Sequence, residues 1–131
     1  MRKLVSSGSH LEGPIGFSRA CRVGNIISVS GTAPIKNGET AYVGDVYGQT
    51  KYCLELSIRA IEEAGGTSND IIRTRIMLTD ISRWEDAAKA HGELFSEIRP
   101  ACTFVEVSRF IDSAWLVETE VDCVLSIGQL D

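Results

Sequence analysis

Two helix-like segments, each passing directly into a strand-like segment, constrain the fold of this chain more than any other feature. Apolar and small side chains recur at helical spacing over residues 46–64 and again over residues 84–98. Residues 71–78 then alternate between the two faces of a strand, and residues 101–106 are largely apolar. Strands of one sheet that are joined through a helix connect by right-handed crossovers. Both helices are therefore expected on one face of a sheet.

Turn and cap signals set the ends of these segments. Asp45 is expected to cap the first helix, and Gly65 to end it, because glycine tolerates the left-handed backbone that follows a helix. Ser82 and Glu85 have the spacing of a capping box for the second helix. Pro100 separates that helix from the strand after it.

The remaining strands come from the two ends of the chain. Two β-like runs within residues 16–34 meet at Gly24-Asn25, a two-residue hairpin signal. Residues 116–126 alternate as a last strand. The order is therefore ββαβαββ, an α+β class with two helices on one face of a mixed sheet. We expect a single domain over residues 1–131, with residues 1–12 as a loose N-terminal segment.

Charge and cysteine usage argue against several functional classes. The net charge of −5 disfavours a nucleic-acid surface, which needs clustered Lys and Arg. No apolar run approaches the roughly 18 residues of a membrane span, and the start lacks the apolar region of a signal peptide, so we expect a cytoplasmic protein. The cysteines form no C-x-x-C pair, which predicts reduced, mostly buried thiols and no metal site. They are Cys21, Cys53, Cys102 and Cys123.

One face of the predicted sheet carries charged side chains. Arg73 and Arg75 lie on one strand, while Glu118, Glu120 and Asp122 lie roughly 7 Å apart on one side of another. A solvated face with cross-strand ion pairs explains this pattern. A polar subunit interface explains it too, as does a cleft that uses a carboxylate chemically. A desolvated Glu there is a candidate general base, because burial raises its pKa.

The histidines and the nucleophile motifs add no independent sign of chemistry. His91 falls in the apolar stripe of the second helix and is expected to be a hydrogen-bonded core residue. His10, in the loose segment, supports no inference. No serine or cysteine stands in a nucleophile elbow, and the glycines lack phosphate-loop spacing.

Five sequence blocks resemble the YjgF/RidA family of reactive intermediate deaminases. In chain order they are GNIISVSGTAPI, GDVYGQTKYCLELSIRAIEEAGG, DIIRTRIMLTDISRW, RPACTFVEVSRF and LVETEVDCV. The resemblance implies a chorismate-mutase-like fold and a homotrimer with three clefts between subunits, the charged sheet face being turned inward. It also implies hydrolysis of enamines and imines derived from amino acids, without a metal or organic cofactor. Some family members are described as endoribonucleases or translation inhibitors.

The resemblance assigns roles to individual residues. Glu118 matches the glutamate that positions or activates water in the family, and Glu120 is the second choice because the turn FIDSAW is one residue longer than usual. A register slip of one residue would place Val117 or Thr119 there and flip the face. Gly31 matches the cleft glycine, whose backbone can approach a ligand closely.

Several positions depart from the family pattern. Cys102 stands where active deaminases have an arginine whose fork holds the substrate carboxylate, and a thiol cannot supply that charge. Phe17 replaces a tyrosine and Phe104 a residue that is often cysteine, so the cleft is expected to be less polar. Arg19 stands where many members have glutamine, and either supplies a displaced positive charge or makes a surface ion pair.

These residues favour a deaminase-type hydrolase of small enamines or imines that lacks the standard carboxylate clamp, with Glu118 as its catalytic residue. The residues expected to bind the substrate are Phe17, Arg19, Gly31, Cys102, Phe104 and Glu120. A non-catalytic trimer that binds a small metabolite in the same cleft is the alternative. A reactive Cys102 thiol would need a nearby base or cation, and RNA cleavage would need a basic or aromatic array that the sequence lacks.

Overall fold

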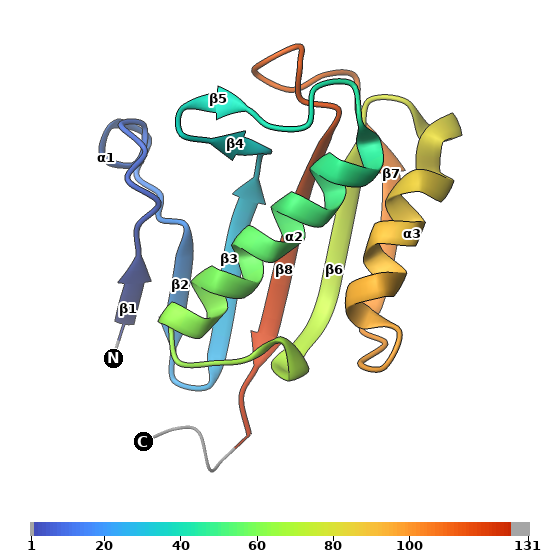
Figure 1. Ribbon diagram of the computed structural model, residues 1–131. Coiled ribbons are helices and arrows are strands. Elements are labelled where there is room, and N and C mark those ends of the chain that lie inside the picture. Colours follow the sequence, from blue (N-terminus) through green and yellow to red (C-terminus); the bar gives the residue numbers. More distant parts are fainter. Residues whose placement is uncertain (1, 127–131) are drawn as a thin grey trace.

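Six strands and two main helices make up the computed structural model, which describes residues 2–126 (Figure 1). The strands are β1 (Arg2–Val5), β2 (Ala20–Val23), β3 (Ile26–Thr32), β6 (Ile71–Leu78), β7 (Ala101–Glu106) and β8 (Val117–Val124). They form one mixed sheet in the order β1-β2-β3-β8-β6-β7, in which only β6 and β7 are parallel neighbours. Helices α2 (Val46–Glu63) and α3 (Trp84–Phe95) cover one face of it (Figure 1).

Several short elements lie outside this sheet and its two main helices. They are helix α1 (Glu12–Ile15), the hairpin of β4 (Ile35–Lys36) and β5 (Glu39–Thr40), and the 3-10 turns η1 (Ser68–Asp70) and η2 (Ile81–Arg83). Between β2 and β3, Val23 pairs with Ile26, which leaves the predicted two-residue turn at Gly24-Asn25. The expected α+β class is confirmed, and β2, β3, α2, β6, α3, β7 and β8 supply the expected order ββαβαββ.

Helix α2 begins and ends as its sequence predicts. The N–H of Gly48 donates to Oδ1 of Asp45 at 2.9 Å, so Asp45 is the N-cap. Gly65 follows the helix with a φ of 99°, a left-handed backbone that favours glycine. The predicted apolar face of the helix is buried against the sheet at Val46, Thr50, Cys53, Leu54, Ser57, Ile61 and Ala64.

The predicted capping box of the second helix is wrong. Oδ1 of Asp80 accepts hydrogen bonds from the N–H and the hydroxyl of Ser82, at 3.0 and 2.6 Å. The Ser82 hydroxyl, which was expected to cap the helix, is therefore bound to the Asp80 carboxylate. A 3-10 turn forms in place of the first α-helical turn. Helix α3 begins only at Trp84, without a side-chain cap, and 48% of Trp84 is exposed although it was expected in the buried stripe.

The N-terminal segment also differs from the expectation of a loose chain. Residues Arg2–Val5 pair antiparallel with β2, and Val5 is buried at the end of the core. The carboxylate of Glu12 accepts hydrogen bonds from the hydroxyls of Ser6 and Ser7 and from the N–H of Ser7. Strand pairing and this local network therefore order a segment in which no periodicity is visible.

The two central strands present the faces that their alternation predicts. Val117, Thr119, Val121 and Cys123 of β8 are buried under the helices, and Glu118, Glu120 and Asp122 lie on the opposite side. In β6, Thr74, Ile76 and Leu78 are buried, but Ile72 is 52% exposed. The alternation over residues 71–78 predicts Ile72 on the same face as Thr74. The ladder between β6 and β8 shifts between Ile71 and Arg73, and this irregularity takes Ile72 off that face.

The buried amide of Gln49, on α2, joins the helix layer to two loops. Its Nε2 donates to the carbonyl oxygen of Ala114 at 3.0 Å and to those of Ala41 and Tyr42 at 3.3 Å each. Its Oε1 accepts from the N–H of Leu116 at 2.8 Å. Since both ends of the amide have partners, Gln49 satisfies backbone groups that helices and strands do not reach.

We expect Gln49→Leu to lower the free energy of unfolding by about 2–4 kcal/mol, because it leaves backbone groups of Ala114 and Leu116 without partners. Urea unfolding followed by circular dichroism measures the change. Glu62→Leu, at an exposed position of the same helix, is the control and should change the value by less than about 0.5 kcal/mol. Equal losses in the two variants would contradict the role of the amide.

Candidate functional site

Glu118 marks one end of the sheet, where β3 ends and β8 begins. Its neighbours Val117 and Thr119 are buried under the helices, so the side chain of Glu118 turns to the uncovered face. Two more of the residues expected at the site act on it directly: Gly31 lies against its carboxylate and the charge of Arg19 acts on its pKa, while Phe17 contacts Arg19. The register of β8 therefore puts Glu118, rather than its neighbours, beside the predicted glycine.

A β-bulge brings the backbone of Gly31 against Glu118. The ladder between β3 and β8 shifts between Val29 and Thr32. A Cβ at position 31 would lie 3.1 Å from Oε1 of Glu118, closer than ordinary van der Waals contact. The carboxylate thus lies directly over a backbone that carries no side chain.

The guanidinium of Arg19 holds this bulge. Its Nη1 donates to the carbonyl oxygens of Gly31 at 2.8 Å and Ser30 at 3.3 Å, and to Oγ1 of Thr32 at 3.0 Å. Its Cζ lies 5.9 Å from the centre of the Phe17 ring, within cation–π range. Arg19 therefore organises the backbone here, in place of the surface ion pair considered from the sequence.

Opposing effects act on the pKa of Glu118. Burial raises this pKa above the ordinary glutamate value, because a desolvated carboxylate is less stable than its neutral form. The positive charge of Arg19 lowers the pKa of Glu118, and the negative charge of Glu120 raises it. A carboxylate with a raised pKa is a stronger proton acceptor, which suits a general base.

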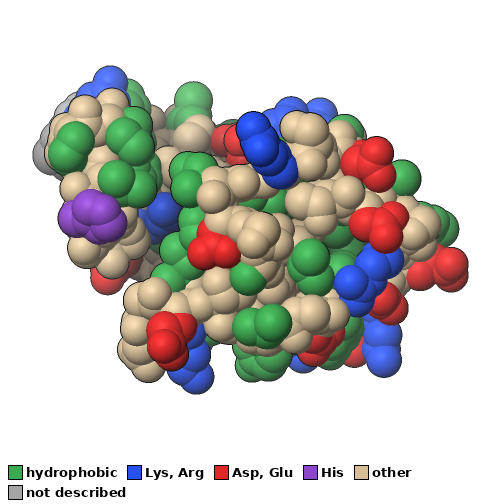
Figure 2. Space-filling view, turned by 90° about the horizontal axis from the view of Figure 1, so that it is seen from above, with side chains coloured by type: hydrophobic (Ala, Val, Ile, Leu, Met, Phe, Trp, Pro, Cys, Tyr) green, Lys and Arg blue, Asp and Glu red, His purple; other side chains and the backbone are tan. Residues whose placement is uncertain are grey.

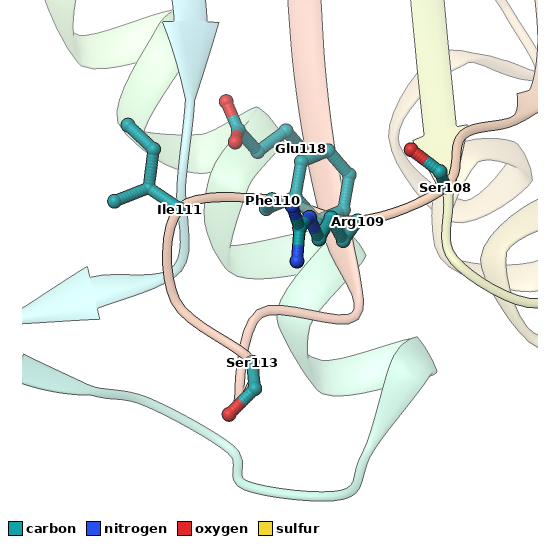
Figure 3. A pocket seen from close by; sticks show the side chains of 6 residues that line it. All are labelled: Ser108, Arg109, Phe110, Ile111, Ser113 and Glu118. Carbon is teal, nitrogen blue, oxygen red and sulfur yellow. The ribbon is translucent and has the colours of Figure 1, made fainter.

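An open hollow of about 760 Å³ adjoins Glu118 (Figure 3). Its other walls come from the loop between β7 and β8, through Ser108, Arg109, Phe110, Ile111 and Ser113. None of these loop residues was predicted from the sequence, where the segment stands out only as a turn one residue too long. The hollow combines one acidic group, one basic group, two hydroxyls and an apolar wall.

Glu120, the second choice for the catalytic carboxylate, forms an ion pair. Its Oε1 lies 2.5 Å from Nη1 of Arg75 on the neighbouring strand, and each side chain is more than 40% exposed. On the same face, Oδ1 of Asp122 accepts from the hydroxyl of Ser28 at 2.9 Å. These partners match the solvated-face interpretation for Glu120 and Asp122, whereas Glu118 has no ion-pair partner within residues 2–126.

Cys102 and Phe104 lie apart from Glu118 in this chain. Strand β7 is separated from β8 by β6, and Cys102 pairs with Thr74, which in turn pairs with Val121. Two strand spacings and three residues along β8 put Cys102 and Glu118 about 14 Å apart. Phe104 faces the helices, where its ring centre lies 6.5 Å from that of Trp84. A single chain therefore does not bring all the predicted site residues together.

Histidine and cysteine side chains take structural positions. His91 is half-buried, shares a 2.8 Å hydrogen bond with the hydroxyl of Thr74, and has its pKa lowered by burial, as expected of a core histidine. Cys53 and Cys123 are buried, Cys21 is half-buried and Cys102 is exposed, so two of the four thiols are buried where most were expected to be. Among residues 2–126 no group of three metal-binding side chains comes together, and nothing hydrogen-bonds to Cys102.

Comparison with known proteins identifies the family. Residues 9–125 match the family described as Endoribonuclease L-PSP. The crystal structure of Rv2704 from Mycobacterium tuberculosis, a member of the YjgF/YER057c/UK114 family, superposes with a TM-score of 0.86 at 39% identity, covering 95% of this chain and all of that one. The chain belongs to the YjgF/RidA family. Its α+β fold is the chorismate-mutase-like fold of that family.

Two curated relatives complete the comparison. The uncharacterized protein SCO2049 of Streptomyces coelicolor is 39% identical over 90% of this chain and 88% of its own length. The 3-aminoacrylate deaminase RutC of Acinetobacter baylyi is 34% identical over 67% of this chain and 71% of its own. YjgF/RidA proteins thus include an enzyme named for deamination. No helix among residues 2–126 has the length and hydropathy to cross a membrane.

We expect Arg19→Gln to raise the pKa of Glu118 further, because it removes the positive charge that stabilises the carboxylate. Glu120→Gln should lower the same pKa, because it removes a like charge. Carbon-13 NMR titration of the Glu118 carboxyl measures both shifts, and Glu62→Gln, on the outside of α2, is the control. Shifts of the same sign in the two site variants would refute this electrostatic picture.

Proposed function

We propose that this YjgF/RidA protein hydrolyses a small enamine or imine and releases ammonia, with Glu118 as the catalytic group. The observation that carries the proposal is a half-buried carboxylate with a raised pKa, set against bare backbone at an open hollow. The deaminase name of the Acinetobacter relative supports the reaction type. We propose this chemistry without a metal or organic cofactor.

The reaction is a hydration followed by an elimination. The Glu118 carboxylate accepts a proton from water, whose oxygen adds to the carbon of the C=N bond. Glu118 returns that proton to the nitrogen, which gives a neutral carbinolamine. The carbinolamine hydroxyl then loses its proton to the Glu118 carboxylate, the nitrogen takes up this proton, and the C–N bond breaks to leave a carbonyl compound and ammonia. An enamine enters the same route after it gains a proton on its β-carbon and loses one from nitrogen, which converts it to the imine. We propose that backbone groups near Gly31, which lies against Glu118, hold the polar atoms of the intermediate.

We further propose a homotrimer with the site between subunits. Glu118 and Cys102 lie far apart in one chain, and the helices leave one sheet face uncovered (Figure 1). Packing that face against neighbouring subunits would bring the Glu118 of one subunit toward the β7 edge of the next. The site would then contain Cys102 where the resemblance places an arginine, so no carboxylate clamp is proposed there.

RNA cleavage receives little support from the surface at this end of the molecule. Lys and Arg side chains are interspersed with Asp and Glu and with apolar side chains (Figure 2). A polyanion-binding surface needs clustered positive charge. We therefore propose a small-molecule substrate. The cytoplasmic location expected from the sequence stays a prediction.

Glu118→Gln should slow hydrolysis by about 10²–10⁴-fold, because an amide cannot accept the proton from water. A serine dehydratase supplies the enamine in situ, and keto-acid release is timed with and without this protein. The wild-type rate should fall as the pH drops through the pKa of Glu118, which burial places above the ordinary glutamate range. Acceleration that persists in Glu118→Gln would exclude this mechanism. No acceleration by the wild type would favour the non-catalytic, metabolite-binding trimer.

Sedimentation equilibrium tests the assembly separately. We expect a particle of three times the 14.3 kDa chain mass. The charge reversal Arg75→Glu on the uncovered face should shift the particle toward monomer, since it replaces the Arg75–Glu120 pair by two like charges. Arg59→Glu, on the exposed side of α2, is the matched control. A monomeric wild-type protein would refute the trimer.

A further inference from the structure

The loop between β7 and β8 brings a free arginine to the hollow beside Glu118. Strand β7 runs toward the same end of the sheet as Glu118, because Glu106 pairs with Leu78 and Leu78 with Val117. Arg109 follows directly in the loop and is the basic residue among those that line the hollow (Figure 3). Its side chain is exposed and makes no hydrogen bond or ion pair with any described residue.

The loop that carries Arg109 is held at both ends. At its start, the N–H of Val107 donates to the carbonyl oxygen of Leu78 at 2.8 Å. At its end, Gln49 binds the carbonyl of Ala114 and the N–H of Leu116. The carboxylate of Asp112 also accepts from the N–H of Ala114 at 2.8 Å. The segment 108–113 is thus a short loop that is anchored at both ends and lines the hollow.

Other arginines near the sheet are engaged or distant. Nη1 of Arg19 is bound to the bulge at Gly31, and Arg75 is paired with Glu120. Arg99 precedes β7 at the opposite end of the sheet from Glu118. Among the described residues, Arg109 is therefore an arginine at this end whose donors are all open to a ligand, and it lines the hollow, which the exposed Lys36 of β4 does not.

The hollow has the polarity that an anionic molecule requires. The carboxylate of Glu118 repels a negative group and favours its binding at the other wall, where Arg109 can donate two hydrogen bonds to it. The hydroxyls of Ser108 and Ser113 line the same space, and Phe110 and Ile111 add an apolar wall. A ligand with an anionic end and an uncharged reacting end fits these walls.

We infer that Arg109 is a specificity-determining residue, which binds the anionic group of the substrate. This inference rests on the proposed function for the reaction, but concerns binding. The loop, rather than β7, then selects the substrate. The reacting carbon lies toward Glu118 and the charged group toward Arg109.

Kinetics and binding test the inference together. With the enamine supplied by serine dehydratase, Arg109→Gln should raise KM by about tenfold to a hundredfold and leave kcat within a factor of about three, as loss of a charged hydrogen bond predicts. Pyruvate, the product of that enamine, should bind the wild type more tightly than uncharged pyruvamide, as measured by calorimetry. Arg109→Gln should weaken pyruvate binding only, and Arg109→Lys should restore part of it.

Arg59→Gln removes the same charge from the exposed side of α2 and should change neither measurement. If the wild type has no hydrolytic activity, the proposed function fails, while selective loss of pyruvate binding in Arg109→Gln still supports this inference. Unchanged pyruvate binding in Arg109→Gln would overturn it, as would a wild type that binds neither probe. Loss of pyruvate binding in Arg19→Gln alone would overturn it in favour of Arg19.

Discussion

The buried amide of Gln49 is the interaction on which the site end of this molecule depends. It satisfies backbone groups of the loop before α2 and of the loop between β7 and β8. Those loops carry no regular ladder of their own at that point, so the amide replaces the hydrogen bonds that secondary structure would supply. A polar group placed at the core edge thereby gives a fixed shape to a surface segment that lines the hollow.

The chemistry of the site follows from how close Glu118 lies to bare backbone. The bulge at Gly31 lets the carboxylate approach, and Arg19 holds that bulge through three acceptors. Burial raises the pKa of Glu118, and the positive charge of Arg19 opposes this rise. The same arginine therefore shapes the backbone and tunes the carboxylate.

Local sequence rules succeeded where one interaction dominated and failed where two competed. Asp45 and Gly65 cap α2 as predicted, because each has a single favourable role. Ser82 does not cap α3, because the carboxylate of Asp80 takes its hydroxyl. Residues 2–5 form a strand that has no pattern of its own, since its hydrogen bonds come from β2.

The sequence alternates between helical and strand periodicity, and the order of these segments determined the α+β fold class and its two layers. The strand periodicity determined which face each central strand presents, including the side on which Glu118 lies. Family resemblance added the expectation that Glu118 and Gly31 belong to the site. The tertiary structure alone decided that Arg19 binds the bulge, that Gln49 anchors the loop and that Arg109 lines the hollow. Those contacts join residues far apart in sequence, and no local spacing encodes them. The separation of Cys102 from Glu118 has the same cause, because strand order is a property of the folded sheet.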